Sequence, residues 1–141
     1  MKNPIGIYEK ALPKDMTWTQ RFEAARAAGY DFLEMSVDET PERMARLDWS
    51  MQERLEFVRA SRECDVPVPT MCLSGHRKIP FGSADAAIRA QADEFMVKAI
   101  RFAADTGIRV IQLAGYDVYY EPTTRESRER YYQGMERAVE E

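Results

Sequence analysis

Short apolar runs alternate with longer, periodically patterned segments along this chain. Each run has the length of a buried strand, and the segment after it repeats apolar residues every three or four positions, as amphipathic helices do. Regular alternation of this kind predicts an α/β fold with a parallel sheet and helical crossovers. The four predicted strands are Ile5–Tyr8, Phe32–Val37, Val68–Leu73 and Val110–Leu113.

Three of the predicted helices start with the sequence of a capping box. In this motif a Ser or Thr caps the first turn, and a residue three positions later reaches back to the cap. An apolar stripe follows each motif, such as Trp18, Phe22 and Ala25 in the first helix. We therefore expect helix starts at three places. They are marked by Thr17 with Gln20, Ser50 with Glu53, and Thr123 with Glu126.

Two glycines mark predicted helix ends. Gly29 and Gly107 each follow an alanine-rich helical segment, at the position where a left-handed residue commonly ends a helix. Aligning the two glycines places Phe32–Glu34 on Val110–Gln112. The segment between them has prolines in place of a glycine, at Pro67 and Pro69. We interpret this as a weak internal repeat of the βα type.

The length is compatible with two arrangements of four βα units. The chain has 141 residues, which is the size of one domain, so we treat residues 1–141 as a single domain. A (β/α)8 barrel of about 250 residues uses about 31 residues for each unit. The first four units, half of such a TIM barrel, therefore fit the chain. A small doubly wound sheet fits it as well.

Composition and charge exclude several classes of protein. Apolar residues make up 45% of the chain and charged residues 31%, as in folded globular proteins. The net charge of −4 opposes sequence-blind binding to nucleic acid, which requires a basic surface. We therefore expect no nucleic-acid partner.

The sequence shows no membrane or export signal, so we expect a cytoplasmic protein without a membrane partner. No apolar run is long enough to span a bilayer, and the residues from Met1 to Pro4 do not resemble a signal peptide. Cys64 and Cys72 form no metal-ligand pattern. Unpaired cysteines fit a reducing compartment.

The loop after the third predicted strand concentrates polar chemistry. Ligands of parallel α/β proteins bind at the carboxyl ends of the strands, and this loop holds Ser74, His76, Arg77 and Lys78. The pair Gly82-Ser83 that follows is predicted to open a helix whose free N–H groups favour an anion. A phosphate or sugar site and an ordinary solvated loop both remain open. His76 is the only histidine, and a lone histidine is more commonly structural than a ligand.

A carboxylate interrupts the second predicted strand. Glu34 lies among apolar residues, where an unpaired charge is costly. Strand alternation predicts that Glu34, Ser36 and Asp38 line one face, with Gln112 at the corresponding place of the fourth strand. A structural ion pair with a neighbouring strand is the alternative for Glu34. Tyrosines near the fourth strand form either a pocket wall or simple packing. They are Tyr116, Tyr119 and Tyr120.

Four loop sequences together resemble one enzyme family. The sequence is similar to the bacterial L-ribulose-5-phosphate (L-xylulose-5-phosphate) 3-epimerases of pentose and ascorbate catabolism. These enzymes belong to the xylose-isomerase-like, endonuclease-IV-like group of TIM barrels. The resemblance covers essentially the whole chain. The motifs are Ile7–Leu12, Phe32–Glu39, Met71–Arg77 with Pro80–Ser83, and Ile111–Tyr120.

The resemblance implies an isomerase that moves a proton at C3 of a ketose phosphate with the help of a divalent metal, zinc or manganese. In the family, the metal ligands and the catalytic glutamates come from later strands. The resemblance therefore assigns no catalytic or metal-binding residue to this chain, which corresponds to the N-terminal half and is expected to be inactive alone. Arg77 or Lys78 suits the phosphate by charge. The predicted substrate-binding residues are Glu34, Ser74, His76, Arg77 and Gln112.

Two other functions remain as alternatives, an endonuclease-IV-like nuclease and a non-enzymatic α/β ligand-binding or interaction module. The acidic balance and the single histidine argue against a nuclease with several metals. We expect a small sugar phosphate as the partner. We also expect a homo-oligomer, because four strands of a barrel leave two unpaired sheet edges.

Overall fold

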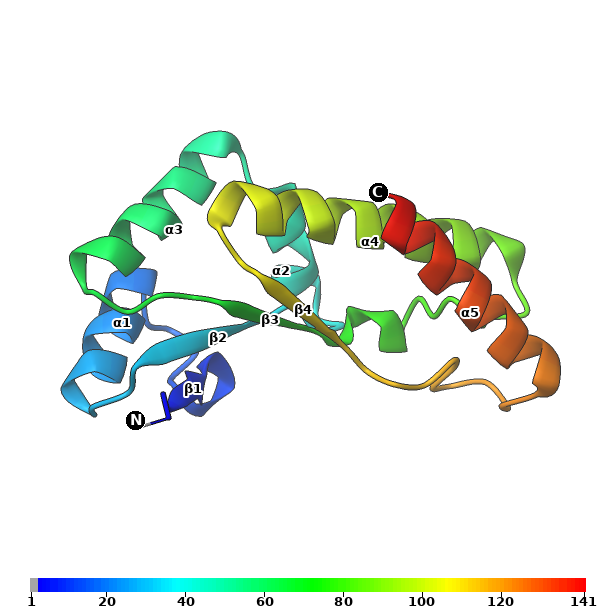
Figure 1. The fold of residues 1–141 in the computed structure, drawn as a ribbon, viewed down its shortest axis with the longest axis horizontal. Coiled ribbons are helices and arrows are strands. Elements are labelled where there is room, and N and C mark those ends of the chain that lie inside the picture. Colours follow the sequence, from blue (N-terminus) through cyan, green and yellow to red (C-terminus); the bar gives the residue numbers. More distant parts are fainter. Residues whose placement is uncertain (1–2) are drawn as a thin grey trace. The chain divides into compact units, whose positions relative to one another are not determined.

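A four-stranded sheet is the framework of the computed structural model, which describes residues 3–141 (Figure 1). The strands follow the chain in the order β1-β2-β3-β4, and the pairs β1–β2 and β2–β3 are parallel. The predicted α/β class with a parallel sheet is therefore confirmed. The strands are β1 (Gly6–Tyr8), β2 (Phe32–Ser36), β3 (Thr70–Leu73) and β4 (Val110–Leu113).

Every crossover contains a helix, as predicted. The second crossover also holds a short helix that starts at Pro41. Proline fits this position because the first turn of a helix makes no use of its missing N–H. The α-helices are α1 (Trp18–Ala27), α2 (Pro41–Met44), α3 (Met51–Glu63), α4 (Ala86–Thr106) and α5 (Arg125–Glu140). Three short 3-10 helices are η1 (Glu9–Ala11), η2 (Ala45–Asp48) and η3 (Ser74–Arg77).

Two of the three predicted capping boxes are confirmed. Thr17 caps α1 and Ser50 caps α3, each with the expected reciprocal hydrogen bonds. The third prediction, Thr123 with Glu126, is wrong. Thr124 caps α5, and its hydroxyl accepts a bond from Ser127 N at 3.0 Å. The shift by one residue follows from Ser127, which is buried and donates to the Asp117 carboxylate.

Three helix ends share one backbone conformation. Gly29 and Gly107 both have a φ of 80°, which confirms the predicted left-handed ends. The βα repeat between them has the same turn at Asp65, with a φ of 54°. Directly after Asp65, Val66 N donates to Ser61 O at 3.0 Å. The residue after Gly29 makes the equivalent hydrogen bond to a backbone carbonyl of α1. The βα repeat is therefore more regular in the structure than the prolines suggested.

The chain divides into two compact units. Unit 1 comprises the described residues up to Ser36 together with Trp49–Cys72 and Phe102–Gln112. Unit 2 comprises Val37–Asp48, Leu73–Arg101 and Leu113–Glu141. Unit 1 therefore contains nearly all of the sheet, and unit 2 contains the segments that follow β2, β3 and β4.

Unit 1 has an apolar core on one face of its sheet. Leu33, Met35 and Met71 are completely buried there, and α1 packs against both α3 and β2. Beside them, five aromatic rings contact one another in stacked, edge-to-face and tilted pairs. They are Trp18, Phe22, Trp49, Phe57 and Phe102.

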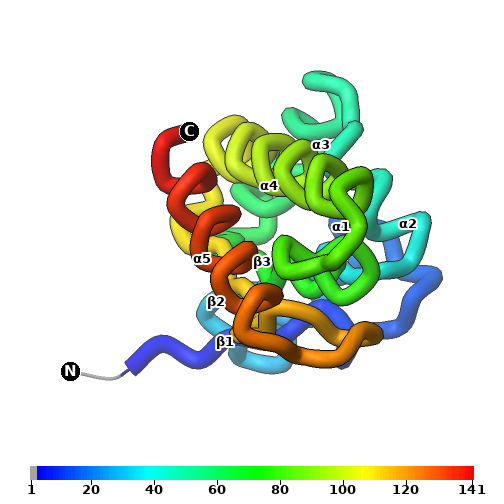
Figure 2. Tube along the Cα trace, turned by 90° about the vertical axis from the view of Figure 1, so that its right-hand side faces the viewer, coloured from blue at the N-terminus to red at the C-terminus, as the bar shows by residue number. Residues whose placement is uncertain are grey.

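The core of unit 2 lies between two helices and the loop after β3. The part of α4 up to Arg101 and α5 run side by side in the ribbon and in the tube view (Figures 1 and 2). An ion pair joins these helices, with Arg137 Nη2 at 2.9 Å from Asp93 Oδ1. Beside them, Phe81 and Phe95 enclose the ring of His76.

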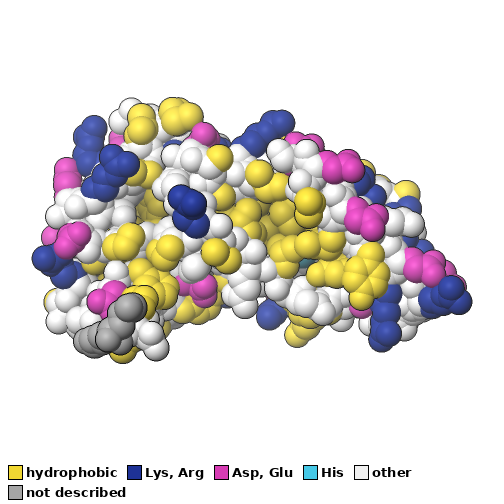
Figure 3. All heavy atoms as spheres, viewed as in Figure 1, with side chains coloured by type: hydrophobic (Ala, Val, Ile, Leu, Met, Phe, Trp, Pro, Cys, Tyr) yellow, Lys and Arg dark blue, Asp and Glu magenta, His cyan; other side chains and the backbone are white. Residues whose placement is uncertain are grey.

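Apolar side chains also reach the surface, and several are uncovered on the face seen in Figure 3. Val110 of β4 is 53% exposed, in a strand that lies at the end of the sheet order. Among residues 3–141, no helix is long and apolar enough to cross a bilayer.

Candidate functional site

A row of polar side chains crosses one face of the sheet in unit 1. Glu34 is in register with Tyr8 on one side and Thr70 on the other, so the three side chains share a face. The neighbouring residues Leu33 and Met35 point to the opposite, buried face. The residues of this polar sheet face are Tyr8, Glu34, Ser36, Thr70 and Cys72, and the βα repeat adds Gln112.

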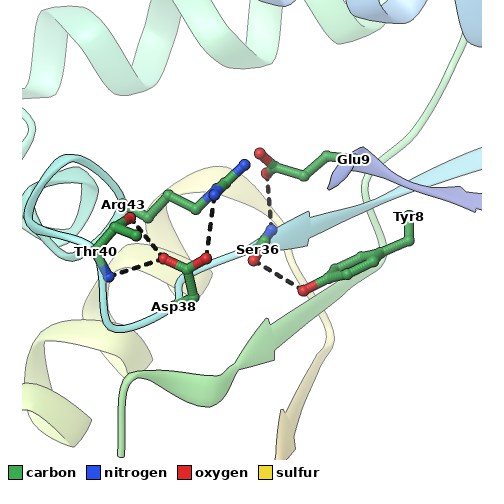
Figure 4. A network of polar contacts seen from close by, with 6 residues as sticks. All are labelled: Tyr8, Glu9, Ser36, Asp38, Thr40 and Arg43. Atoms are coloured by element: carbon green, nitrogen blue, oxygen red, sulfur yellow. Dashed lines mark hydrogen bonds and ion pairs between the residues drawn. The ribbon is translucent and has the colours of Figure 1, made fainter. Parts of the chain in front are cut away.

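Hydroxyl groups connect the strands across the polar sheet face. Tyr8 Oη donates to Ser36 Oγ at 2.9 Å (Figure 4), and Thr70 Oγ1 donates to Glu34 Oε2 at 2.9 Å. Burial is the largest cause that raises the pKa of Tyr8 to about 12. Tyr8 therefore remains a neutral donor at physiological pH. The face presents hydroxyls, a thiol and one carboxylate, which suit the hydroxyl groups of a sugar.

The carboxylate of Glu34 accepts a hydrogen bond from a neutral side chain. Among residues 3–141, no cation lies within ion-pair distance of Glu34; its bond comes from the Thr70 hydroxyl. The predicted ion-pair alternative is therefore wrong.

Asp38 does not extend the polar sheet face, although alternation along the predicted strand placed it there. The strand β2 ends at Ser36, and Asp38 belongs to unit 2. Its carboxylate accepts bonds from Thr40 and lies 3.1 Å from Arg43 Nη1 (Figure 4). Asp38 is therefore held within its own loop.

Sequence reasoning missed a buried carboxylate beside this face. Glu9 follows β1 in η1 and is only 1% exposed. One of its oxygens accepts the backbone N–H of Ser36 at 2.8 Å (Figure 4). In sequence, Glu9 is one polar residue in a loop between Tyr8 and Lys10, and no local pattern signals its burial.

Gln112 has a different environment from Glu34. It is exposed, whereas Ile111 and Leu113 on either side are half-buried. Within residues 3–141, no side chain hydrogen-bonds to its amide. Both the donor and the acceptor of Gln112 therefore remain available to a ligand.

The loop after β3 belongs to unit 2 and buries two of the predicted site residues. Ser74 and His76 are each 7% exposed. The His76 ring lies 4.6 Å from the Phe81 ring and 5.2 Å from the Phe95 ring, and Nε2 is 3.4 Å from Ala92 O. Burial lowers the pKa of His76 to about 4, so the imidazole is neutral at physiological pH. This environment favours the structural alternative for His76.

Arg77 projects from the same loop into a group of tyrosines. Its Nε donates to Tyr116 Oη at 2.8 Å, and its guanidinium carbon lies 5.0 Å from the centre of the Tyr119 ring. Nearby, the Tyr120 hydroxyl lies 3.1 and 3.0 Å from the two carboxylate oxygens of Glu39. The hydrogen bond with Tyr116 is the largest cause that raises the pKa of Arg77. We call these five residues the Arg77 cluster.

The predicted start of a helix at Gly82-Ser83 is wrong. The helix α4 begins at Ala86, and several N–H groups before and in its first turn already have partners. Gly82 N donates to a backbone carbonyl of the loop after β4. Ala84 N donates to Glu121 at 2.9 Å and Ala87 N to Asp85 at 2.8 Å. Carboxylates of the chain therefore accept two of the N–H groups at the start of this helix.

The side chains of residues 3–141 do not fit a divalent metal. Within that range, no three His, Cys, Asp or Glu side chains lie close enough together to hold an ion. A structural or catalytic metal site usually takes at least three such ligands. No step of the chemistry can therefore be placed on a metal held by these residues alone.

The parallel sheet, the helical crossovers and the polar residues at the carboxyl ends of the strands define a TIM-barrel type of α/β protein. Residues 22–141 match the family model of the xylose isomerase-like TIM barrel. The chain belongs to this family. The predicted fold class, the first four units of a (β/α)8 barrel, is thereby confirmed over the doubly wound alternative.

Comparison with known proteins places relatives of this chain among epimerases. It is 58% identical over 137 residues to the L-ribulose-5-phosphate 3-epimerase UlaE of Escherichia coli, and equally to that of Shigella sonnei. These matches cover 97% of this chain but 48% of each relative. The chain thus spans about half the length of the curated relatives it matches. The predicted resemblance is confirmed.

Solved structures of sugar epimerases share the fold. A D-psicose 3-epimerase from Clostridium cellulolyticum H10 superposes with a TM-score of 0.77 at 15% identity, over 98% of this chain and 48% of that one. An L-ribulose 3-epimerase gives a TM-score of 0.75 at 20% identity, over 99% and 46%. At such identities the likeness concerns the fold alone.

Proposed function

We propose that this chain forms the first four βα units of an L-ribulose-5-phosphate 3-epimerase, which interconverts L-ribulose 5-phosphate and L-xylulose 5-phosphate. The observation that carries the proposal is the 58% identity to the Escherichia coli epimerase over 97% of the chain. The reaction removes the proton at C3, next to the C2 carbonyl, and returns one to the opposite face of the carbon.

In this proposal, the chain binds and orients the sugar. Glu34 accepts hydrogen bonds from sugar hydroxyls, and the amide of Gln112 donates and accepts them. Arg77 contacts the phosphate. Ser74 and His76 are buried, and they support the loop that carries Arg77.

A divalent metal, zinc or manganese, would act as a Lewis acid on the substrate oxygens in such an epimerase. Residues 3–141 hold no ligand set that fits it. We therefore place the metal ligands and the two carboxylates that move the proton outside these residues. This chain alone is accordingly expected to be inactive.

Several features support a compartment and an oligomeric state for the protein. Both cysteines are free thiols, which suits the cytoplasm. The strands β1 and β4 lie at the two ends of the sheet order, and an open edge favours association with another chain or a second copy. We propose a cytoplasmic homo-oligomer that acts on a sugar phosphate, in L-ascorbate degradation.

The proposal is tested by exchange of the C3 proton in D2O. The chain is mixed with the part of the Escherichia coli relative that it does not match, and L-ribulose 5-phosphate and Mn²⁺ are added. We expect loss of the C3 signal in the 1H NMR spectrum for the mixture, and no loss for either part alone.

Light scattering provides the control, because it shows whether the two parts form a complex. A complex without exchange would contradict the proposed activity. Exchange by the chain alone would show that the catalytic groups lie within it. Tight, salt-sensitive binding to abasic DNA instead would support the nuclease alternative.

A further inference from the structure

A cavity lies between α1 and α3, on the side of the sheet opposite to the polar sheet face. The two helices pack against each other, and α1 also packs against β2. The residues that line the cavity all belong to unit 1. Its volume is about 320 Å³, which is at the lower end of the range for small-molecule pockets. The cavity is therefore large enough for a small ligand, and the proposed reaction makes no use of it.

Three aromatic rings form walls of this cavity. Trp18 is the first residue of α1, and Trp49 lies directly before the N-cap of α3. The ring centre of Trp18 lies 4.7 Å from that of Phe57 and 6.1 Å from that of Trp49, with interplanar angles of 80° and 82°. Both tryptophans are half-buried, whereas Phe57 is only 2% exposed. Rings that surround a cavity in this way can enclose a quaternary ammonium group.

Two carboxylates give the same cavity a negative charge. Glu53 and Glu56 line it from α3, and neither forms an ion pair within residues 3–141. The hydrogen bond from the Ser50 hydroxyl is the largest cause that lowers the pKa of Glu53, so this side chain is charged at physiological pH. Among the residues that the structure describes, no lysine or arginine lines the cavity. We call it the Trp pocket; its residues are Trp18, Trp49, Glu53, Glu56 and Phe57.

The aromatic rings of unit 1 already attract cations of the chain itself. The guanidinium carbon of Arg21 lies 5.0 Å from the centre of the Trp18 ring, and that of Arg54 lies 5.2 Å from the centre of the Phe102 ring. Neither arginine lines the Trp pocket. The pocket is thus a place beside these rings where two carboxylates have no cationic partner within residues 3–141.

We propose that the Trp pocket binds a small organic cation with a quaternary ammonium group. The methyl groups on the nitrogen pack against the rings, and the positive charge is attracted by the rings and by the two carboxylates. The proposal does not depend on the epimerase activity, because no residue of the Trp pocket belongs to the polar sheet face or to the Arg77 cluster.

Other classes of ligand fit the Trp pocket less well. The carboxylates disfavour an anion, and the N–H of Glu53 in the first turn of α3 already donates to the Ser50 hydroxyl. A metal ion usually takes at least three protein ligands, and residues 3–141 hold no such group. A neutral apolar ligand would gain nothing from the two carboxylates. The pocket therefore favours a cation that has an apolar surface of its own.

The fluorescence of tryptophan tests the proposal, because the chain has only two tryptophans and both line the pocket. The complete 141-residue chain is titrated with choline at constant ionic strength. We expect a saturable change in emission with a Kd of about 1–10 mM. The uncharged carbon analogue of choline, in which a carbon atom replaces the nitrogen, should bind at least about tenfold more weakly.

Substitutions that keep the shape of the pocket identify the groups that bind. Glu53→Gln combined with Glu56→Gln should weaken choline binding about threefold to tenfold and leave the binding of the neutral analogue unchanged. Glutamine also serves in a capping box, so the start of α3 is retained. Trp49→Phe should weaken choline binding as well, because a phenyl ring attracts cations less strongly than an indole ring; Trp18 then reports the titration.

A matched control removes a negative charge elsewhere on the same helix. Glu63 is exposed at the end of α3 and does not line the pocket, so Glu63→Gln should leave the Kd for choline unchanged. Equal affinities of the Glu53/Glu56 double variant and the Glu63 variant would overturn the proposal. So would a response to choline that does not saturate, or equal binding of choline and its neutral analogue.

Discussion

The two units place their polar side chains in opposite ways. In unit 1, Tyr8, Glu34 and Thr70 lie at strand positions that the sheet register fixes, and hydroxyl hydrogen bonds link the row across the strands. In unit 2, loops hold the polar groups, with His76 buried between aromatic rings and Arg77 stacked on one. The strands thus present a regular face for hydroxyl groups. The loops surround each polar side chain differently, and these surroundings shift the pKa of the side chain.

The largest expected contrast concerns acid stability. The pKa of His76 is about 4 in the folded chain against an ordinary value of 6.5, so below about pH 6.5 the unfolded chain binds more protons. Stability is therefore lost as the pH falls from 6.5 towards 4, by about 3 kcal/mol in total. No histidine lies in the aromatic cluster of unit 1. Urea unfolding at pH 7 and pH 4.5 measures this difference.

The matched variant for this comparison is His76→Phe, which keeps a ring between Phe81 and Phe95. We expect its unfolding free energy to depend less on pH than that of the wild type over the same range. Because His76 is the only histidine, its imidazole NMR signals report the pKa directly. A His76 pKa near 6.5, or equal acid loss in both proteins, would remove the contrast between the units.

A smaller effect is expected at the helix ends of unit 1. Asp65 adopts the left-handed conformation that glycine adopts at Gly29 and Gly107, and this conformation is strained for a residue with a side chain. Its ion pair with Arg26 is exposed and contributes little. Asp65→Gly should therefore raise the unfolding free energy by up to about 1 kcal/mol in urea titrations.

The converse substitution gives the control for Asp65. An added Cβ at Gly107 meets nothing within 4 Å, so Gly107→Ala adds conformational strain without a clash. It should destabilise the chain by about 1 kcal/mol. A destabilised Asp65→Gly together with a neutral Gly107→Ala would show that these turns are not equivalent repeats.

The sequence predicted the parts of the fold that depend on local pattern. The alternating elements, the caps at Thr17 and Ser50, and the glycine turns depend on neighbours a few positions away. The cap at Thr124 was missed because a tertiary bond from Ser127 to Asp117 decides it.

The candidate site was predicted less completely, because its partners are distant in the chain. Glu34, Arg77 and Gln112 were singled out by residue type and by their place within a strand or directly after one. The Tyr116 hydroxyl that holds Arg77 is 39 positions away, and nothing local pairs the two residues. The burial of Glu9 and His76 likewise arises only when separate loops pack together.

The central proposal is that the polar sheet face of unit 1 contacts the sugar, and Gln112→Leu in the reconstituted epimerase tests it most directly. Gln112 is exposed and makes no side-chain hydrogen bond within residues 3–141, so its loss should not affect stability. We expect KM to rise about tenfold for L-ribulose 5-phosphate and for L-ribulose alike. Unchanged KM values for both ketoses would contradict the assignment of the polar sheet face to the sugar.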